Sequence, residues 1–108
     1  MKRWDGRCAV TGFAIVKLLR ASHIKPWRDS NHAERLDPYN GLLLAPGYDA
    51  AFDAGYISFN DDGRVVLSAA LVSDAASLIG IATNVRLRDL SPEHMAYLAY
   101  HRSEVFLK

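Results

Sequence analysis

Two aspartates four residues apart, Asp49 and Asp53, are the first candidates for chemistry in this chain of 108 residues. If the stretch PGYDAAFDAG forms a helix, both carboxylates project from the same face, one turn apart. Two carboxylates at this spacing repel each other unless a cation lies between them, and oxygen ligands of this kind suit Mg²⁺ or Mn²⁺. A solvated helix face without a metal explains the same spacing. The pair alone therefore leaves both interpretations open.

His23 and Asn40 are two further candidates, and each also has an ordinary explanation. His23 stands in SHIKPW, where an apolar segment ends. An imidazole can take a proton from water near neutral pH, as a general base does, but it can also simply pack in a core. Asn40 lies seventeen residues further on in PYNG, where a turn asparagine is expected on backbone grounds. The case for a site therefore depends on the ordered set of four residues.

A strand–loop–strand–helix order would position these four side chains. The β-branched and apolar segment 14–24 predicts an extended chain that Pro26 ends, and GLLLA (41–45) predicts a second short strand. Between them, Ser30 is expected to cap a short helix over NHAERL. Pro46 and Gly55 are typical of the first turn and the C-terminal end of a helix.

The remaining sequence predicts a hairpin and two more helices. YISF and RVVLS flank the turn NDDG, which favours a β-hairpin. A helix is expected within residues 71–80, and a last helix follows Ser91. One apolar face of the last helix is expected to consist of Leu90, Ala96 or Tyr97, Tyr100 and Val105.

The order of the four candidate residues resembles that of the HNH nucleases, which belong to the ββα-metal (His-Me finger) superfamily. The stretches RCAVTG, LLRASHIKPW, RLDPYNGLLLAP, DAAFDAGYISF and YLAYHRSEVF resemble the HNH domain at the C-terminus of many bacterial restriction-type endonucleases. The resemblance extends from Arg7 to Phe106. It implies an α+β fold with a ββα-metal finger, an additional β-hairpin and a C-terminal helix, and a single HNH nuclease domain over residues 1–108.

The resemblance also implies a role for each of the four residues. His23 matches the general base that activates water, and Asn40 matches the asparagine that ties the loop to the finger. Asp49 takes the place of the last histidine of the H-N-H pattern, and Asp53 stands where some relatives have a second metal ligand. Oxygen ligands shift the expected cofactor from zinc to Mg²⁺ or Mn²⁺.

Two residues depart from the pattern of the family. Many relatives have an Asp or His metal ligand just before the base, where this chain has Ser22, so the complete ligand set is left open. Many relatives also hold a structural zinc with pairs of cysteines. Cys8 is the only cysteine here, so no structural zinc is expected.

The charged residues are unevenly distributed along the chain. Residues 1–35 have a net charge of +5, and residues 36–63 have a net charge of −5. A basic segment followed by an acidic one is compatible with a polyanion bound near a metal site, although chance segregation of surface charges gives the same pattern.

Basic residues on both sides of the candidate base are expected to contact DNA. Backbone phosphates could bind Lys17, Arg20, Lys25 and Arg28, with ordinary surface charge as the alternative for each. Trp27 is expected to pack under the loop rather than to face DNA.

The composition favours a reducing compartment. A single cysteine permits no intrachain disulfide, no apolar run approaches the length of a membrane helix, and no signal-peptide pattern follows the first residues. We therefore expect a cytoplasmic protein without membrane contact. The abrupt start on an ordered motif is compatible with a piece of a longer protein.

Together these features predict a metal-dependent DNA endonuclease of a bacterial restriction or defence system. The alternative is a non-catalytic DNA-binding or structural module that retains the HNH fold. DNA specificity is expected from another domain or a partner protein, because so small a domain has little room for a long readout surface. One finger holds one active site, so a double-strand break would need a homodimer or two events.

Overall fold

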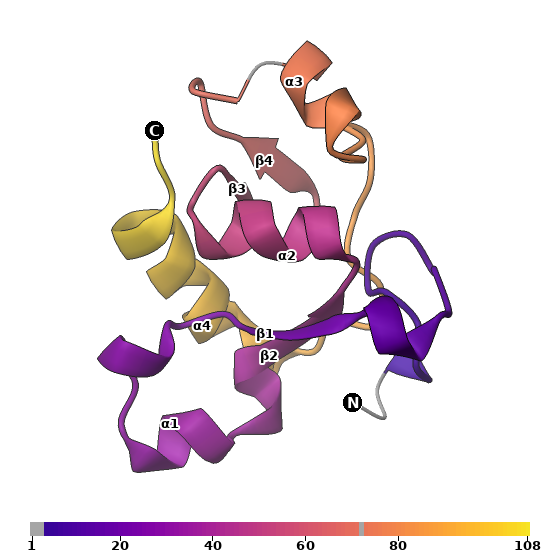
Figure 1. Cartoon of the computed structure of the whole chain (residues 1–108). Coiled ribbons are helices and arrows are strands. Elements are labelled where there is room, and N and C mark those ends of the chain that lie inside the picture. Colours follow the sequence, from indigo (N-terminus) through magenta and orange to yellow (C-terminus); the bar gives the residue numbers. More distant parts are fainter. Residues whose placement is uncertain (1–3, 72) are drawn as a thin grey trace.

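The computed structural model describes residues 4–71 and 73–108 (Figure 1). The N-terminal half contains the elements η2 (Val16–Leu18), β1 (Arg20–His23), η3 (Trp27–Asp29), α1 (His32–Leu36), η4 (Pro38–Asn40), β2 (Gly41–Leu44) and α2 (Pro46–Asp53). The C-terminal half contains β3 (Ile57–Phe59), β4 (Val65–Leu67), α3 (Ser73–Leu78), η5 (Pro92–His94), α4 (Met95–Tyr100) and the π-helical turn η6 (His101–Val105).

The expected ββα unit is present. Strands β1 and β2 pair in an antiparallel ladder in which Ser22 lies opposite Leu42 and His23 lies opposite Gly41. All four residues of β2 are buried, and α2 packs against β1. The long connection between the two strands, residues 24–40, is folded into the short helices η3, α1 and η4.

Helix α2 presents an apolar face to the core and its acids to the other side. Tyr48, Ala51 and Phe52 are buried, whereas Asp49 is half-buried and Asp53 is exposed. This separation follows from the helical period, since residues three and four apart share a face.

Two glycines allow close contacts at the ends of α2. A Cβ atom at Gly47 would lie 2.2 Å from the carbonyl oxygen of Ile79, so no larger residue fits there. Gly55 ends the helix with a φ of +83°, as expected from the sequence, and a Cβ atom there would lie 2.2 Å from the carbonyl oxygen of Val105.

The predicted hairpin is confirmed. Strands β3 and β4 are antiparallel, with Ile57 opposite Leu67 and Phe59 opposite Val65. Helix α2 packs against β1 and against β3, and in Figure 1 it lies between the β1–β2 and β3–β4 pairs.

The buried face of the last helix differs from the prediction. His94, Leu98 and His101 are buried, whereas Tyr97 and Tyr100 are only half-buried. The two histidines form polar contacts inside the protein, and the two tyrosine hydroxyls reach carboxylates of the loop. A face chosen by hydropathy alone could not include such histidines.

Two local predictions were too simple, and the helix expected within 71–80 is confirmed. The extended segment expected over 14–24 is a turn of 3-10 helix followed by the shorter strand β1. Helix α1 is capped by Asn31, which forms a reciprocal capping box with Glu34, and not by Ser30. The helix expected within 71–80 is α3 (Ser73–Leu78), and Val72 lies outside the described residues.

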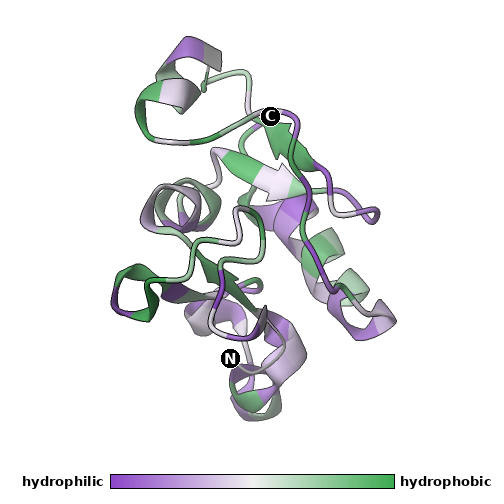
Figure 2. Ribbon diagram, turned by 90° about the vertical axis from the view of Figure 1, so that its right-hand side faces the viewer, coloured by the Kyte–Doolittle hydropathy of each residue, from purple (hydrophilic) through white to green (hydrophobic). Residues whose placement is uncertain are grey.

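The core lies where the two strand pairs, α2 and the last helix meet. In Figure 2 the strands in the interior are coloured mainly as hydrophobic, while helices and turns at the periphery show both colours. The largest buried side chains include Trp4, Tyr48, Phe52 and Phe59. The α+β class is thereby confirmed. Within the described part of the chain, no helix is long and apolar enough to cross a membrane.

Candidate active site

An open pocket between β1, the loop after it and α2 contains three of the four candidate residues. Its volume is about 480 Å³, and it is lined by Ala21, Ser22, His23, Pro26, Trp27, Arg28, Asp49 and Asp53. The end of β1 supplies His23, and one face of α2 supplies both aspartates. Two segments well separated in the sequence thus bring an imidazole and two carboxylates to one pocket.

The imidazole of His23 is oriented by the backbone of α1. Its Nε2 atom lies 3.3 Å from the carbonyl oxygen of Arg35. A carbonyl oxygen only accepts hydrogen bonds, so this contact requires the proton on Nε2 and leaves the lone pair of the neutral ring on Nδ1. The ring therefore has one nitrogen for positioning and one nitrogen available for a proton.

Trp27 does not pack under the loop, contrary to the expectation. It is 56% exposed and meets the His23 ring edge-on, with 5.4 Å between ring centroids. The guanidinium of Arg35 lies over the Trp27 ring, 4.6 Å from the ring centroid. Arg35 Nε also donates a hydrogen bond to the Trp27 carbonyl at 2.9 Å. Trp27 and Arg35 thus form one wall beside the histidine, an arrangement that no local sequence pattern indicates.

Asn40 lies beneath the loop rather than in the pocket. Its side chain is 1% exposed, and its Oδ1 atom accepts a hydrogen bond from the backbone N–H of Lys25 at 2.8 Å. Its Nδ2 atom donates to the Glu34 carbonyl at 3.1 Å, with a longer contact to Ser30 Oγ at 3.4 Å. One buried amide therefore joins the residue before β2 to two points of the connection that follows His23, namely Lys25 and Glu34.

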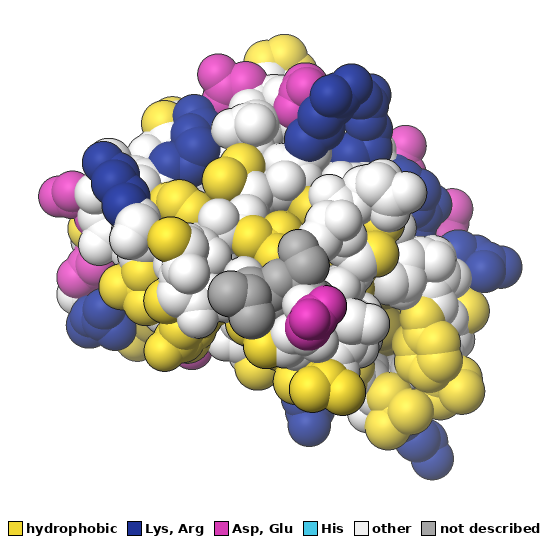
Figure 3. Space-filling view, turned by 90° about the horizontal axis from the view of Figure 1, so that it is seen from above, with side chains coloured by type: hydrophobic (Ala, Val, Ile, Leu, Met, Phe, Trp, Pro, Cys, Tyr) yellow, Lys and Arg dark blue, Asp and Glu magenta, His cyan; other side chains and the backbone are white. Residues whose placement is uncertain are grey.

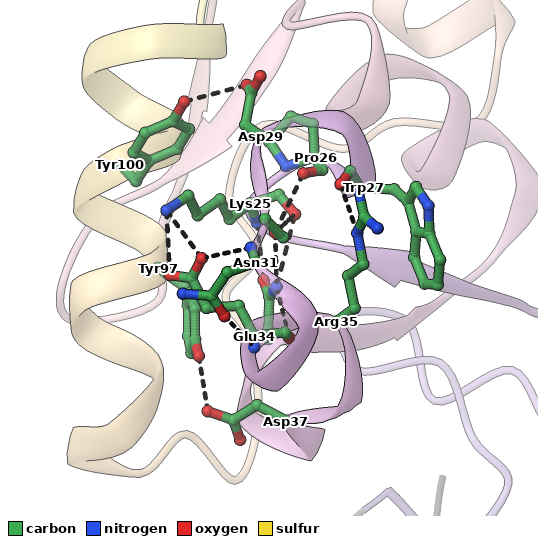
Figure 4. Close-up of polar contacts among 12 residues, drawn as sticks. Lys25, Pro26, Trp27, Asp29, Asn31, Glu34, Arg35, Asp37, Tyr97 and Tyr100 are labelled. Atoms are coloured by element: carbon green, nitrogen blue, oxygen red, sulfur yellow. Dashed lines mark hydrogen bonds and ion pairs between the residues drawn. The ribbon is translucent and has the colours of Figure 1, made fainter.

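Lys25, a predicted DNA contact, forms contacts within the protein. Its Nζ atom lies 3.0 and 3.1 Å from the two carboxylate oxygens of Glu34 and 4.9 Å from the Tyr100 ring centroid. Hydrogen bonding from the Asn31 backbone and then the Lys25 ammonium lower the pKa of Glu34. Figure 4 shows these residues meeting between the loop and the last helix.

Two tyrosines of α4 form hydrogen bonds with the connection 24–40 (Figure 4). The hydroxyl of Tyr97 donates to Asp37 at 2.6 Å, and the hydroxyl of Tyr100 donates to Asp29 at 3.0 Å. The hydrogen bond to Asp37 raises the pKa of Tyr97 to about 12. Residues three apart on a helix lie on the same face, so the sequence could have indicated that both hydroxyls point the same way. It could not have indicated that they bind Asp37 and Asp29.

The other three predicted DNA contacts occupy different places. Arg28 lines the pocket, and its side chain is 80% exposed. Lys17 in η2 and Arg20 at the start of β1 are exposed but do not line it. The geometry therefore places Arg28 beside the candidate base.

The donors in the pocket fit a cation with a mostly aqueous shell. Neither Asp49 nor Asp53 forms an ion pair or a side-chain hydrogen bond among the described residues. Ser22 Oγ, on the wall of the same pocket, is buried and has no hydrogen-bond partner in the described chain. Carboxylate and hydroxyl oxygens suit Mg²⁺ or Mn²⁺, which retain several waters, better than zinc.

The protein supplies few ligands of its own. Among residues 4–71 and 73–108, no group of three or more His, Cys, Asp and Glu side chains is arranged to hold a metal ion. Water and a phosphate oxygen would therefore have to complete the shell of a cation in this pocket.

His101 belongs to the core and not to the pocket. Its ring stacks on Phe52 with centroids 3.8 Å apart, Nε2 donates to the Phe52 carbonyl at 2.8 Å, and Nδ1 accepts from the Ser58 hydroxyl at 2.8 Å. Burial lowers the pKa of His101 to about 4, so the ring is neutral at pH 7.

Comparison with known proteins identifies the family that the segment containing these residues matches. Residues 8–60 match the family model described as HNH endonuclease, and this segment includes all four candidate residues. This part of the chain belongs to the HNH endonuclease family. The HNH segment ends one residue after β3, so the family match covers the whole ββα unit.

A solved structure extends the similarity beyond the HNH segment. The chain is similar to a protein described as "Modification dependent TagI restriction endonuclease", with 25% identity and a TM-score of 0.57. The similarity covers 94% of this chain and 34% of that protein, so the chain spans about a third of its length. No curated protein matches the sequence.

Proposed function

We propose that this chain is the catalytic domain of a DNA endonuclease of restriction type, which hydrolyses phosphodiester bonds with His23 as general base. The observation that carries the proposal is the shared pocket of His23, Asp49 and Asp53 within a segment of the HNH family. Phosphodiester hydrolysis needs a base for water and a cation for the developing negative charge, and this pocket offers groups for both.

Each side chain has a task in the proposed mechanism. The Arg35 carbonyl orients the imidazole of His23, and Nδ1 takes a proton from the attacking water. Asn40 keeps the loop in place and acts through His23 rather than on the substrate. Arg28 can hold a backbone phosphate at the open side of the pocket.

Asp49 and Asp53 would hold a divalent cation, Mg²⁺ or Mn²⁺. When bound, such a cation stabilises negative charge on the phosphate and on the leaving oxygen. The buried hydroxyl of Ser22 is a further oxygen on the pocket wall, and it lacks a partner in the described structure. The proposal includes no structural zinc.

Sequence specificity is assigned to other parts of the system. The TagI protein is described as modification dependent, and this chain spans only 34% of it. We propose that a further domain or partner protein selects the DNA, that two copies or two events are needed for a double-strand break, and that the protein acts in the cytoplasm.

A nicking assay on supercoiled plasmid tests the proposal. Purified chain should produce open circles with Mg²⁺ or Mn²⁺ and none with EDTA, on modified or unmodified DNA. A parallel preparation of His23→Ala detects contaminating nuclease. Absence of nicking on both substrates, with either metal and with DNA binding intact, would instead support the non-catalytic DNA-binding module.

A further inference from the structure

A second polar cleft lies at the edge of the β3–β4 hairpin. The segment 85–87 pairs with the hairpin, because the N–H of Val65 donates to Val85 at 3.1 Å and the N–H of Leu87 donates to Gly63 at 2.8 Å. Between these bonds, Arg64 and Arg86 form an isolated antiparallel bridge.

This register brings two positive charges together. Residues directly opposite in an antiparallel pair project from the same face, with Cβ atoms about 5 Å apart, and like charges there are destabilising. Arg64 and Arg86 are both exposed, which keeps the cost small. An anion bound between the two guanidinium groups would convert this repulsion into attraction.

The four polar side chains around the cleft can donate hydrogen bonds to such an anion. The cleft has a volume of about 330 Å³ and is lined by Arg64, Val65, Thr83, Asn84, Val85 and Arg86. Among the described residues, no carboxylate lines the cleft. The guanidinium fork matches the oxygens of a phosphate, and the hydroxyl of Thr83 and the amide of Asn84 add neutral donors.

The positive charge of the cleft is only partly balanced. Arg64 Nε lies 3.4 Å from Asp62, but both side chains are more than half exposed, so this ion pair is weak. Arg86 has no ion-pair partner within the described chain. The cleft therefore retains a net positive charge that a ligand can use.

This cleft is separate from the pocket of His23. The two share no lining residue, and β4 lies across α2 from the β1–β2 pair (Figure 1). On the face shown in Figure 3, Lys and Arg side chains occur in several separate groups, with hydrophobic and uncharged side chains between them.

We propose that Arg64 and Arg86, with Thr83 and Asn84, form a second phosphate-binding site. Its ligand is a phosphate oxyanion, carried either by a DNA backbone or by a free phosphate. The site does not depend on the proposed cleavage, because it contains none of the residues assigned to that reaction.

Amide chemical shifts measured during titration test the site. The ¹⁵N-labelled full chain is titrated in EDTA with inorganic phosphate in one arm and with a short DNA duplex in the other. Shifts are expected at Arg64 and at residues 83–86. Shifts there with phosphate alone identify a free anion as the ligand, and shifts there with the duplex identify backbone phosphates. Their absence in both arms overturns the proposal.

Two variants and a control separate specific binding from general charge. Arg86→Ala should weaken binding at these amides roughly five- to tenfold, the value of one charge-assisted hydrogen bond at an exposed site. Arg86→Lys should be intermediate, because it keeps the charge but loses the fork. Arg7→Ala removes an exposed arginine elsewhere and should bind as wild type.

Asp62→Asn provides a test in the opposite direction. Asp62 Oδ1 accepts the backbone N–H of Arg64 at 3.1 Å, and an asparagine oxygen can keep this bond while removing the charge that competes for Arg64. Binding should become tighter. Weaker or unchanged binding in Asp62→Asn, or wild-type binding in Arg86→Ala, would contradict the site. Because EDTA prevents metal-dependent cleavage, neither result depends on nuclease activity.

Discussion

The side-chain oxygen of Asn40 accepts a hydrogen bond from the backbone N–H of Lys25, with 2.8 Å between the two atoms. Lys25 lies two residues after His23, so this bond fixes the chain just beyond the candidate base. The other end of the same amide binds the Glu34 carbonyl, one residue before Arg35, whose carbonyl contacts the His23 ring. A single buried side chain thus supports both sides of the imidazole.

Asn40→Ala should loosen this support without removing a group from the pocket. The N–H of Lys25 would lose its partner and the carbonyl of Glu34 would keep only the N–H of Asp37, at a cost of about 1–3 kcal/mol in the free energy of unfolding. Hydrogen exchange at the Lys25 amide should accelerate, and cleavage should fall sharply while DNA affinity changes little. Asn60→Ala, in an exposed turn, is the control. Wild-type exchange and wild-type cleavage in Asn40→Ala would reduce this residue to an ordinary turn asparagine.

Asp49→Asn and Asp53→Asn should each weaken binding of Mn²⁺ and slow cleavage while the fold persists. Both side chains face the pocket and not the core, so the melting temperature of the metal-free protein should change little. Calorimetric titration of Mn²⁺ measures the affinity. Asp74→Asn, in the first turn of α3, is the matched control. An affinity equal to wild type in both pocket variants would remove these carboxylates from the ligand set.

Ser22→Asp should strengthen metal binding at the expense of the metal-free protein. Ser22 is 5% exposed, and a carboxylate there would be buried close to two others, so the free energy of unfolding should decrease without metal. A cation in the pocket would offset this repulsion, so Mn²⁺ should raise the melting temperature more than in wild type. Ser22→Ala is the comparison and should be at least as stable as wild type, because the lost hydroxyl has no partner in the described structure. An unchanged Mn²⁺ affinity in Ser22→Asp would place this position outside the metal site.

Stability should fall as the pH decreases from 6.5 towards 4 because of His101. In this range the unfolded chain binds a proton that the folded protein does not, since burial lowers the pKa of His101 to about 4. The stabilisation is fully present above pH 6.5, and the loss across the window is on the order of 3 kcal/mol. Urea unfolding between pH 4.5 and 7 measures it. The lowered pKa of Glu34 acts below its ordinary value of 4.5 and so does not account for a loss near pH 6.

A variant identifies the histidine responsible. His101→Gln should be less stable at pH 7 but should lose most of this pH dependence, whereas His32→Gln, on the exposed start of α1, should retain it. An unaltered pH profile in His101→Gln would show that another group titrates.

The prediction from sequence was accurate where local patterns and the family order agree. The hairpin around Asp62 and Gly63, the strand Gly41–Leu44 and the helix from Pro46 follow from turn residues, apolar runs and proline placement. The shared pocket follows from the strand–loop–strand–helix order. In these places, local propensity and tertiary packing favour the same structure.

Long-range polar contacts could not be predicted from the sequence. Tyr97 and Tyr100 looked like apolar helix residues, yet their hydroxyls bind carboxylates sixty or more positions away in the chain. Lys25 is predicted to contact DNA, and the sequence did not indicate that its ammonium also contacts Glu34 and the ring of Tyr100. Buried histidines in the last helix replaced the expected apolar face for the same reason, because their partners, such as Ser58 and Phe52, come from distant elements.

Single-turnover cleavage by His23→Ala tests the central claim most directly. The variant should fold and bind DNA and Mn²⁺ as wild type does, yet cut about 10²- to 10⁴-fold more slowly, the usual contribution of a general base. His32→Ala, with its side chain outside the pocket, should cut at the wild-type rate. A folded His23→Ala protein that binds DNA and cuts at the wild-type rate would contradict the account.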